Sequence, residues 1–249
     1  MTLVKLKQEM NQLKNPDKEK IFVRFFKTGK GDYGEGDCFL GLTVPEQRIL
    51  AKKYLGLELI DVEKLLASKW HEHRLTGGLI LTYKFMQAEK REEREKKNQS
   101  GEETKREIFD FYLKHLRGIN NWDLVDLTAD KIVGAYLQNK QKRERMILYQ
   151  LAKSTNLWER RIAIIATFNF IKHKDFDDTL KISEILLNDN HDLIQKAVGW
   201  MLREIGKRDQ KTEENFLHQY YQTMSRTMLR YAIEKFPEPK RQAYLKNMI

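Results

Sequence analysis

The amino-acid sequence predicts an all-α protein, and more specifically an α-solenoid of HEAT-like helical repeats. Apolar residues recur at helical spacing along almost the whole chain, and no segment shows the period-two alternation of a β-strand. All four prolines stand where helices are expected to begin or end, so the helix interiors are unbroken. About a dozen helices in pairs of roughly 40 residues are typical of HEAT or armadillo repeats. An irregular helical bundle stays open, because the repeats are not similar enough to one another in sequence.

The first expected helices flank a glycine-rich loop. These helices lie at residues 16–29, 45–55, 57–68 and 71–87. The loop TGKGDYGEGDC at residues 28–38 lacks the G-x-x-x-x-G-K-[ST] order of a phosphate-binding loop, and it is as acidic as it is basic. We therefore expect a structural turn or a turn that borders a substrate.

Two histidines and a charged stretch follow the loop. His71 and His73 are two residues apart and point to different helix faces, so hydrogen bonding within the first turn or between helices is expected rather than a metal site. Residues 89–107 alternate Lys, Arg and Glu around the sequence NQSG at 98–101. This pattern indicates a solvated helix end and a loop, without a function of its own.

The rhythm of one helix, a short break and another helix continues to the end of the chain. The remaining expected helices lie at residues 108–116, 122–137, 143–154, 157–173, 176–188, 192–207, 212–223 and 227–236, with a short one after Pro239. Because the rhythm does not change, we expect residues 1–249 to form a single HEAT-like helical-repeat domain.

Composition and charge limit the classes of function. Hydrophobic residues make up 41% of the 249 residues, which is enough for a sizeable core. The formal net charge of +10 indicates a polyanionic partner, with nucleic acid first and an anionic membrane surface second. Cys38 is the only cysteine, and the chain shows neither a signal peptide nor an apolar run of roughly 20 residues. We therefore expect a cytoplasmic protein without internal disulfides or a membrane span.

The segment NNWDLVD places an aromatic ring and a carboxylate near the start of a helix. Asn120 or Asn121 can cap the helix, and Asp123 then falls in the first turn, where the helix dipole favours a carboxylate. Asp126 lies one turn further on, between apolar residues, on the face that carries Trp122. A carboxylate in that position has either a buried partner or a chemical role.

Two later helices also place tryptophan beside polar residues. The segment LWERRIAI contains Trp158 followed by Arg160 and Arg161, and the segment VGWMLRE contains Trp200. Each is weak by itself, because a tryptophan in a helical repeat usually belongs to the core and paired arginines usually form a solvated face or an ion pair.

Taken together, the motifs make the chain resemble the AlkD-like DNA glycosylases of the DNA alkylation repair family, which are HEAT-like helical proteins. The segments that carry the resemblance are FKTGKGDYGEGD (26–37), VPEQR (44–48), HEHR (71–74), NWDLVD (121–126), WERR (158–161), KAVGWMLRE (196–204) and RTMLRYA (226–232). They stand in the family's order and at family-like spacings, and they cover nearly the whole chain.

The resemblance implies a set of site residues. It places the catalytic carboxylate on Asp126, the lesion-contacting indoles on Trp122 and Trp200, and a DNA-backbone contact on Arg161. It also implies a concave basic DNA-binding face, with no metal and no cofactor. The expected partner is double-stranded DNA containing alkylated purines. The protein is expected to be a monomer without an obligate protein partner, associated with the nucleoid when it acts.

The reaction implied by the resemblance suits these residue types. Alkylation of a purine at N3 or N7 makes the base cationic and therefore a good leaving group, so one carboxylate can suffice. Asp126 would stabilise the cationic sugar and position the attacking water, and the two indoles would flank the positive charge. We expect a monofunctional DNA glycosylase that releases 3-methyladenine and 7-methylguanine.

Two alternatives stay open. A non-catalytic HEAT-like scaffold that binds nucleic acid through charge alone would not need Asp126. A protein-interaction solenoid would bind nucleic acid only weakly and only at low salt. The sequence does not distinguish among alkyl lesions, and Arg226 and Arg230 are candidates either for DNA contacts or for a solvated face.

Overall fold

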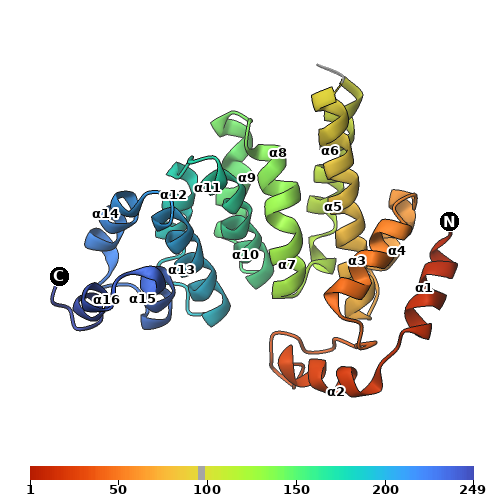
Figure 1. The fold of residues 1–249 in the computed structure, drawn as a ribbon, viewed down its shortest axis with the longest axis horizontal. Coiled ribbons are helices and arrows are strands. Elements are labelled where there is room, and N and C mark those ends of the chain that lie inside the picture. The colour runs from red at the N-terminus through yellow and green to blue at the C-terminus, as the bar shows by residue number, and fades with distance from the viewer. Residues whose placement is uncertain (95–98) are drawn as a thin grey trace. The chain divides into compact units, whose positions relative to one another are not determined.

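The computed structural model describes residues 1–94 and 99–249, and these residues are predominantly helical (Figure 1). Within these two ranges there is no β-strand, and one isolated β-bridge joins Cys38 to Trp70. Most of the helix–helix contacts join helices that are one or two elements apart in the chain, as in HEAT-like repeats. The all-α prediction is therefore confirmed.

The chain forms two compact units, Met1–Ile132 and Val133–Ile249. That residues 1–249 make up one domain stays a prediction. None of the described helices is both long and apolar enough to cross a lipid bilayer.

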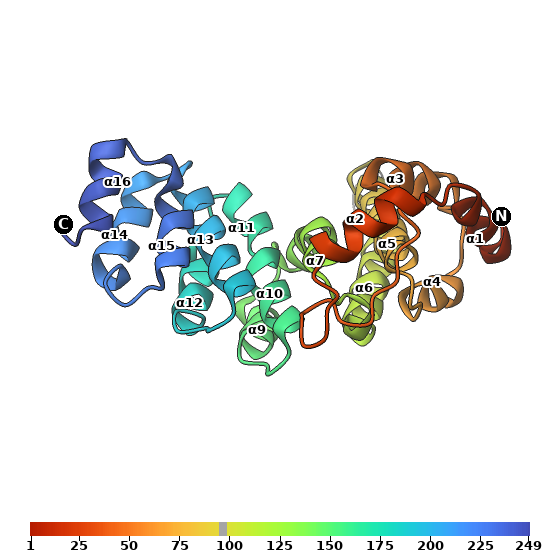
Figure 2. The same cartoon turned by 90° about the horizontal axis from the view of Figure 1, so that it is seen from below.

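In the first unit, α5 is the central helix, and α3, α4, α6 and α7 all pack against it. The helices of this unit are α1 (Leu3–Gln12), α2 (Pro16–Phe25), α3 (Val44–Lys53), α4 (Leu59–Leu66), α5 (His71–Arg94), α6 (Gln99–Lys114) and α7 (Trp122–Ala129), with a 3-10 turn at Leu116–Gly118. Helix α2 lies across the ends of α5 and α7 (Figures 1 and 2).

Local signals explain where these helices begin. The side chain of Asn15 accepts hydrogen bonds from two backbone N–H groups of α2, and Pro16 suits the first position because it has no N–H to satisfy. Thr43 and Glu46 form a capping box at the start of α3. These starts agree with those expected from the sequence.

Helix α1 is a feature that the sequence pattern did not predict. Leu6 and Met10 are four residues apart and fully buried, but the helix is otherwise rich in Lys and Gln. The side chain of Thr2 caps it by accepting a hydrogen bond from the backbone N–H of Lys5 at 3.3 Å. Two buried side chains are too few to give a visible apolar period in the sequence.

The charged stretch around residue 98 is more helical than expected. Helix α6 begins at Gln99, so Ser100 and Gly101 belong to a helix rather than to the expected loop. The physical reason is close packing on α5, since a Cβ at Gly101 would lie only 3.1 Å from the carbonyl oxygen of Ala88. Residues 95–98, also part of the expected loop, lie outside the described residues.

In the second unit, α13 is the central helix, and α10, α12, α14 and α15 pack against it. The helices of this unit are α8 (Ala135–Leu137), α9 (Lys142–Ala152), α10 (Leu157–Ala166), α11 (Phe168–Lys172), α12 (Asp177–Ile185), α13 (Asp192–Gly206), α14 (Gln210–Tyr220), α15 (Arg226–Ala232) and α16 (Glu238–Leu245). Gly199 allows α13 and α15 to approach closely, because a Cβ there would lie 2.4 Å from the carbonyl oxygen of Met228.

A buried glutamate makes the stability of the second unit sensitive to pH. Glu213 of α14 is 1% exposed, and its Oε1 has no hydrogen-bond partner among the described residues. Burial and the nearby Glu214 carboxylate raise the pKa of Glu213 to about 8, against the smaller opposing effect of Arg203. The side chain is therefore protonated and neutral at pH 7.

We expect the free energy of unfolding to fall as pH rises from 6 to 8, because over this range the folded protein still holds on Glu213 a proton that the unfolded chain has already released near pH 4.5, so unfolding releases a proton. At about 1.4 kcal/mol per pKa unit, the fall attributable to Glu213 is roughly 2 kcal/mol. Glu213→Gln should abolish this part of the pH dependence in urea denaturation curves. Glu159→Gln, on α10, serves as the control and should retain it; equal pH profiles for the unaltered protein and Glu213→Gln would contradict the assignment.

Candidate active site

The start of α7 brings Trp122 and Asp126 to one wall of a pocket. The side chain of Asn121 accepts a hydrogen bond from the backbone N–H of Trp122 at 2.8 Å and so begins the helix there, as expected from the sequence. Trp122 and Asp126 are four residues apart and both line a cavity of about 450 Å³. Both side chains are partly exposed, so a ligand in the cavity can reach them.

The remaining walls of this cavity are mostly apolar. They come from α2, from the segment that leads into α3, and from the first turns of α5 and α7. The lining residues are Phe22, Phe25, Phe26, Leu42, Thr43, Val44, Pro45, Gln47, His71, Glu72, Trp122, Asp123, Asp126 and Leu127. A charge that enters such an environment interacts strongly with the carboxylate on its wall, because little water screens it.

Two phenylalanines of the α2 region hold the Trp122 ring. Phe26 stacks on Trp122 with ring centroids 5.4 Å apart and an interplanar angle of 24°, and Phe25 meets it edge-on at 5.6 Å and 72°. Phe25 is nevertheless 59% exposed. The sequence pattern did not connect these phenylalanines with Trp122, since 96 residues separate Phe26 from Trp122.

Asp123 has a larger role than its place in the first turn indicated. Its Oδ1 accepts a hydrogen bond from the backbone N–H of Leu124, which is the expected first-turn role. Its Oδ2 also accepts a hydrogen bond from Nε2 of His71 at 2.8 Å, and both side chains are buried. The structure therefore ties the start of α7 to the start of α5.

His71 is hydrogen-bonded on both sides of its ring, which agrees with the expected interhelical role. Its Nδ1 donates to Oδ2 of Asp37 at 3.1 Å, while Nε2 donates to Asp123. Burial lowers the pKa of His71, but the Asp123 charge and the hydrogen bonds to both carboxylates outweigh it and raise the pKa to about 9. His71 therefore stabilises the fold most at pH values below its unfolded pKa of 6.5, and this contribution is lost as pH rises through 9.

The glycine-rich loop ends in a buried carboxylate that joins this cluster. Asp37 accepts hydrogen bonds from Nη2 of Arg74 at 2.6 Å and from Nδ2 of Asn121 at 3.2 Å, in addition to the one from His71. Burial raises the pKa of Asp37, but the His71 hydrogen bond and the Arg74 charge lower it further, so the carboxylate stays ionised. The loop is thus anchored on both α5 and α7, which supports the structural role expected for it.

Glu72 pins the backbone that forms another wall of the pocket. Its carboxylate accepts hydrogen bonds from the N–H groups of Leu40, Gly41 and Leu42 at 2.9, 2.8 and 3.2 Å. Gly41 has a φ of +82°, and a Cβ there would lie 2.2 Å from the carbonyl oxygen of Asn15. Both the left-handed backbone and the close approach therefore require glycine.

We expect Gly41→Ala to lower the free energy of unfolding by roughly 2–4 kcal/mol, from backbone strain and overpacking together. Gly56→Ala is the matched control, because a Cβ at Gly56 meets no atom within 4 Å and needs no left-handed backbone. Urea denaturation of the two variants measures the difference. A loss for Gly41→Ala no larger than that for Gly56→Ala would show that the pinned segment can shift.

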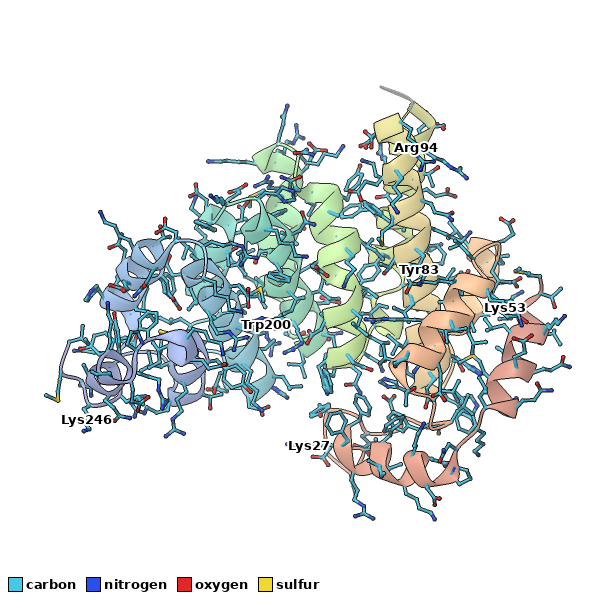
Figure 3. The ribbon with its side chains drawn as sticks, viewed as in Figure 1. Lys27, Lys53, Tyr83, Arg94, Trp200 and Lys246 are labelled. Atoms are coloured by element: carbon cyan, nitrogen blue, oxygen red, sulfur yellow. The ribbon has the colours of Figure 1, made fainter. Side chains whose placement is uncertain are left out.

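Trp200 and Arg161 belong to the second unit, and their expected roles stay predictions. Trp200 lies on α13 (Figure 3) and is half-buried. Its ring packs on Phe168 with centroids 5.9 Å apart. Lys172 and Arg208 lie over the Phe168 ring at 4.3 and 5.9 Å, which places cations near this aromatic pair. Arg161 is 5% exposed and its Nη1 donates to the carbonyl oxygen of Leu193, so it also stabilises the packing of α10 against α13.

Comparison with known proteins agrees with the resemblance seen in the motifs. Residues 6–236 match the family model described as DNA alkylation repair enzyme. The chain belongs to this family. No cluster of three or more His, Cys, Asp or Glu side chains in the described part of this family member could hold a metal ion. No curated protein matches the chain.

Solved structures share the fold of this DNA alkylation repair family member. A structure described as a predicted DNA alkylation repair enzyme from Enterococcus faecalis aligns with a TM-score of 0.67 and 18% identity, over 90% of this chain and 97% of that one. The protein smu.31 of Streptococcus mutans aligns with a TM-score of 0.52 and 16% identity, over 88% and 98% of the two chains. At these identities the likeness concerns the fold alone.

Proposed function

We propose that this family member is a monofunctional DNA glycosylase. It would excise cationic N3- and N7-alkylated purines, such as 3-methyladenine and 7-methylguanine, from duplex DNA by hydrolysing the N-glycosidic bond. The observation that carries the proposal is the placement of Trp122 and Asp126 one turn apart on the wall of an aromatic pocket. Membership of the DNA alkylation repair family supports it.

A single carboxylate is sufficient for this chemistry. The alkylated base already carries a positive charge, so it can leave without protonation by a general acid, which ordinary glycosides need. As the bond to the base breaks, positive charge moves to the sugar, and the Asp126 carboxylate stabilises it. The same carboxylate orients or deprotonates the attacking water.

The aromatic walls favour a cationic base over a neutral one. A cation against an indole face is stabilised by about 0.5 to 2 kcal/mol, and a neutral base does not gain this electrostatic part. Trp122 is held in one orientation by Phe25 and Phe26, so little rotamer entropy is lost when a base binds. We assign Trp200 of the second unit as the other lesion-contacting indole and Arg161 as a DNA-backbone contact.

The charge of the chain suits a duplex partner. A formal net charge of +10 favours binding to phosphates with release of counterions. We propose that the HEAT-like repeats present a concave basic face to double-stranded DNA, and that the protein acts as a monomer, without a cofactor or an obligate protein partner.

Release of 3-methyladenine and 7-methylguanine from methylated duplex DNA tests the proposal. We expect the unaltered protein to release both bases, and Asp126→Asn to lower the single-turnover rate by roughly 10²- to 10⁴-fold, which is about 3 to 5 kcal/mol of transition-state stabilisation. Duplex affinity should be retained or slightly increased, because the substitution removes a negative charge.

Asp110→Asn is the matched control for the change in charge. Asp110 is an exposed carboxylate on α6 with a long ion pair to Arg106 at 3.7 Å, and its replacement should leave the rate unchanged. If the unaltered protein binds duplex DNA but releases neither base, the glycosylase proposal is wrong. The non-catalytic HEAT-like scaffold then becomes the better account of this chain.

A further inference from the structure

The buried cluster around His71 adjoins the candidate active site, and its His71 and Asp123 side chains form part of the pocket lining, but the cluster has no part in the chemistry proposed above. The His71 ring packs against both Phe26 and Phe39, with centroids 4.7 and 4.8 Å away, and the two phenylalanine rings stack on each other at 5.2 Å. Its two nitrogens donate to Asp123 and Asp37. The ring is 2% exposed and is therefore fixed both by packing and by hydrogen bonds.

Two routes lead from His71 to the residues on the pocket wall. The first route runs through Asp123, which follows Trp122 and stands three residues before Asp126 in α7. The hydrogen bond from the His71 ring to Asp123 therefore fixes the rotation of α7 about its axis. Through Phe26, which contacts both the His71 ring and the Trp122 ring, His71 fixes the orientation of the indole.

We propose that His71 is a positioning residue of this site, which acts through Asp123 and Phe26 to hold Asp126 and Trp122 in their reactive arrangement. The role in the reaction rests on the proposed glycosylase function. Small displacements are costly in such sites, because a shift of about 1 Å can lower a rate by roughly 10²-fold.

This positioning of Asp126 and Trp122 depends on protonation of the His71 ring. The charged groups that act on His71 are Asp37 from the loop, Asp123 from α7 and Arg74 from its own helix. The neighbouring Glu72 carboxylate accepts hydrogen bonds from three backbone N–H groups. Only an imidazolium can donate to two carboxylates at once, since a neutral ring turns a lone pair toward one of them. Its raised pKa agrees with this state at pH 7.

Rates and affinities of variants at pH 7 provide the first test. We expect His71→Gln and Asp123→Asn each to lower the single-turnover rate of base release by roughly 10- to 100-fold, with duplex affinity changed less than about twofold. If His71 acts through Asp123, the double variant should be no slower than the slower single variant. His115→Gln is the matched control. His115 is paired with Glu63, with Nε2 and Oε1 3.1 Å apart, and neither residue lines the pocket, so this variant should keep the full rate.

Three results of this test would overturn the positioning role. One is a His71→Gln rate equal to that of His115→Gln. Another is a double variant whose loss is the product of the two single losses, because His71 and Asp123 would then act independently. The third is a loss of duplex affinity as large as the loss of rate, which indicates general disruption of the unit.

A second measurement does not depend on base release, nor on whether a variant of His71 folds. In the unaltered protein at pH 7, ¹⁵N NMR should show both His71 ring nitrogens protonated. The indole signal of Trp122, assigned by its loss in Trp122→Phe, should shift with the same midpoint as the His71 signals when the pH is raised toward 10. A neutral ring at pH 7, or an indole signal that does not move as His71 titrates, would overturn the role of His71. If the two signals titrate together but the protein releases no base, the glycosylase proposal is wrong, while the structural coupling between His71 and Trp122 still holds.

Discussion

The hydrogen-bonded ion pair between His71 and Asp123 connects the two helices that carry the candidate site. A buried charge without its partner is strongly unfavourable, and breaking such a pair typically costs about 3–5 kcal/mol, so His71 restricts where the start of α7 can lie. Asp37 completes the charge balance from the opposite side of the ring and brings the glycine-rich loop with it. A loop, a central helix and the helix of Trp122 and Asp126 thus depend on one imidazolium.

The pocket beside this cluster combines mostly apolar walls with the charged carboxylate of Asp126. Most of its lining is aromatic or aliphatic, and two other carboxylates of the lining are hydrogen-bonded within the fold: Asp123 to His71, and Glu72 to three backbone N–H groups. Asp126 is the carboxylate that the fold places on the wall and partly exposes. An apolar pocket with a partly exposed carboxylate suits an aromatic cation, which is the state of an N3- or N7-alkylated purine.

The second unit follows the same packing rule with different polar details. One long helix, α13, is surrounded by its neighbours, and Gly199 permits close contact with α15 where any side chain would clash. The second unit buries the protonated carboxyl group of Glu213, whereas the first unit contains buried ion pairs of His71 with Asp123 and of Arg74 with Asp37. The two units therefore respond to alkaline pH through different groups, Glu213 by gaining a buried charge and His71 by losing one.

The sequence by itself determined most of the helices and the neighbourhood of Trp122 and Asp126. Caps such as Asn15, Asn121 and the Thr43–Glu46 box act within a few residues, and the i, i+4 spacing of Trp122 and Asp126 already places them on one helix face. The family motifs added the expected roles, because they keep their order along the chain. Where local contacts set the structure, sequence reasoning was sufficient.

Only the tertiary structure decided which side chains meet across the chain. His71 and Asp123 are 52 residues apart, and His71 and Asp37 are 34 apart, so no periodic pattern connects them. The stacking of Phe26 on Trp122 and the use of Glu72 to pin Leu40, Gly41 and Leu42 depend equally on how the helices pack. Helix α1 escaped detection for a related reason, since only two of its side chains are buried. Long-range contacts are set by the packing of whole helix faces, and a single sequence does not show which faces meet.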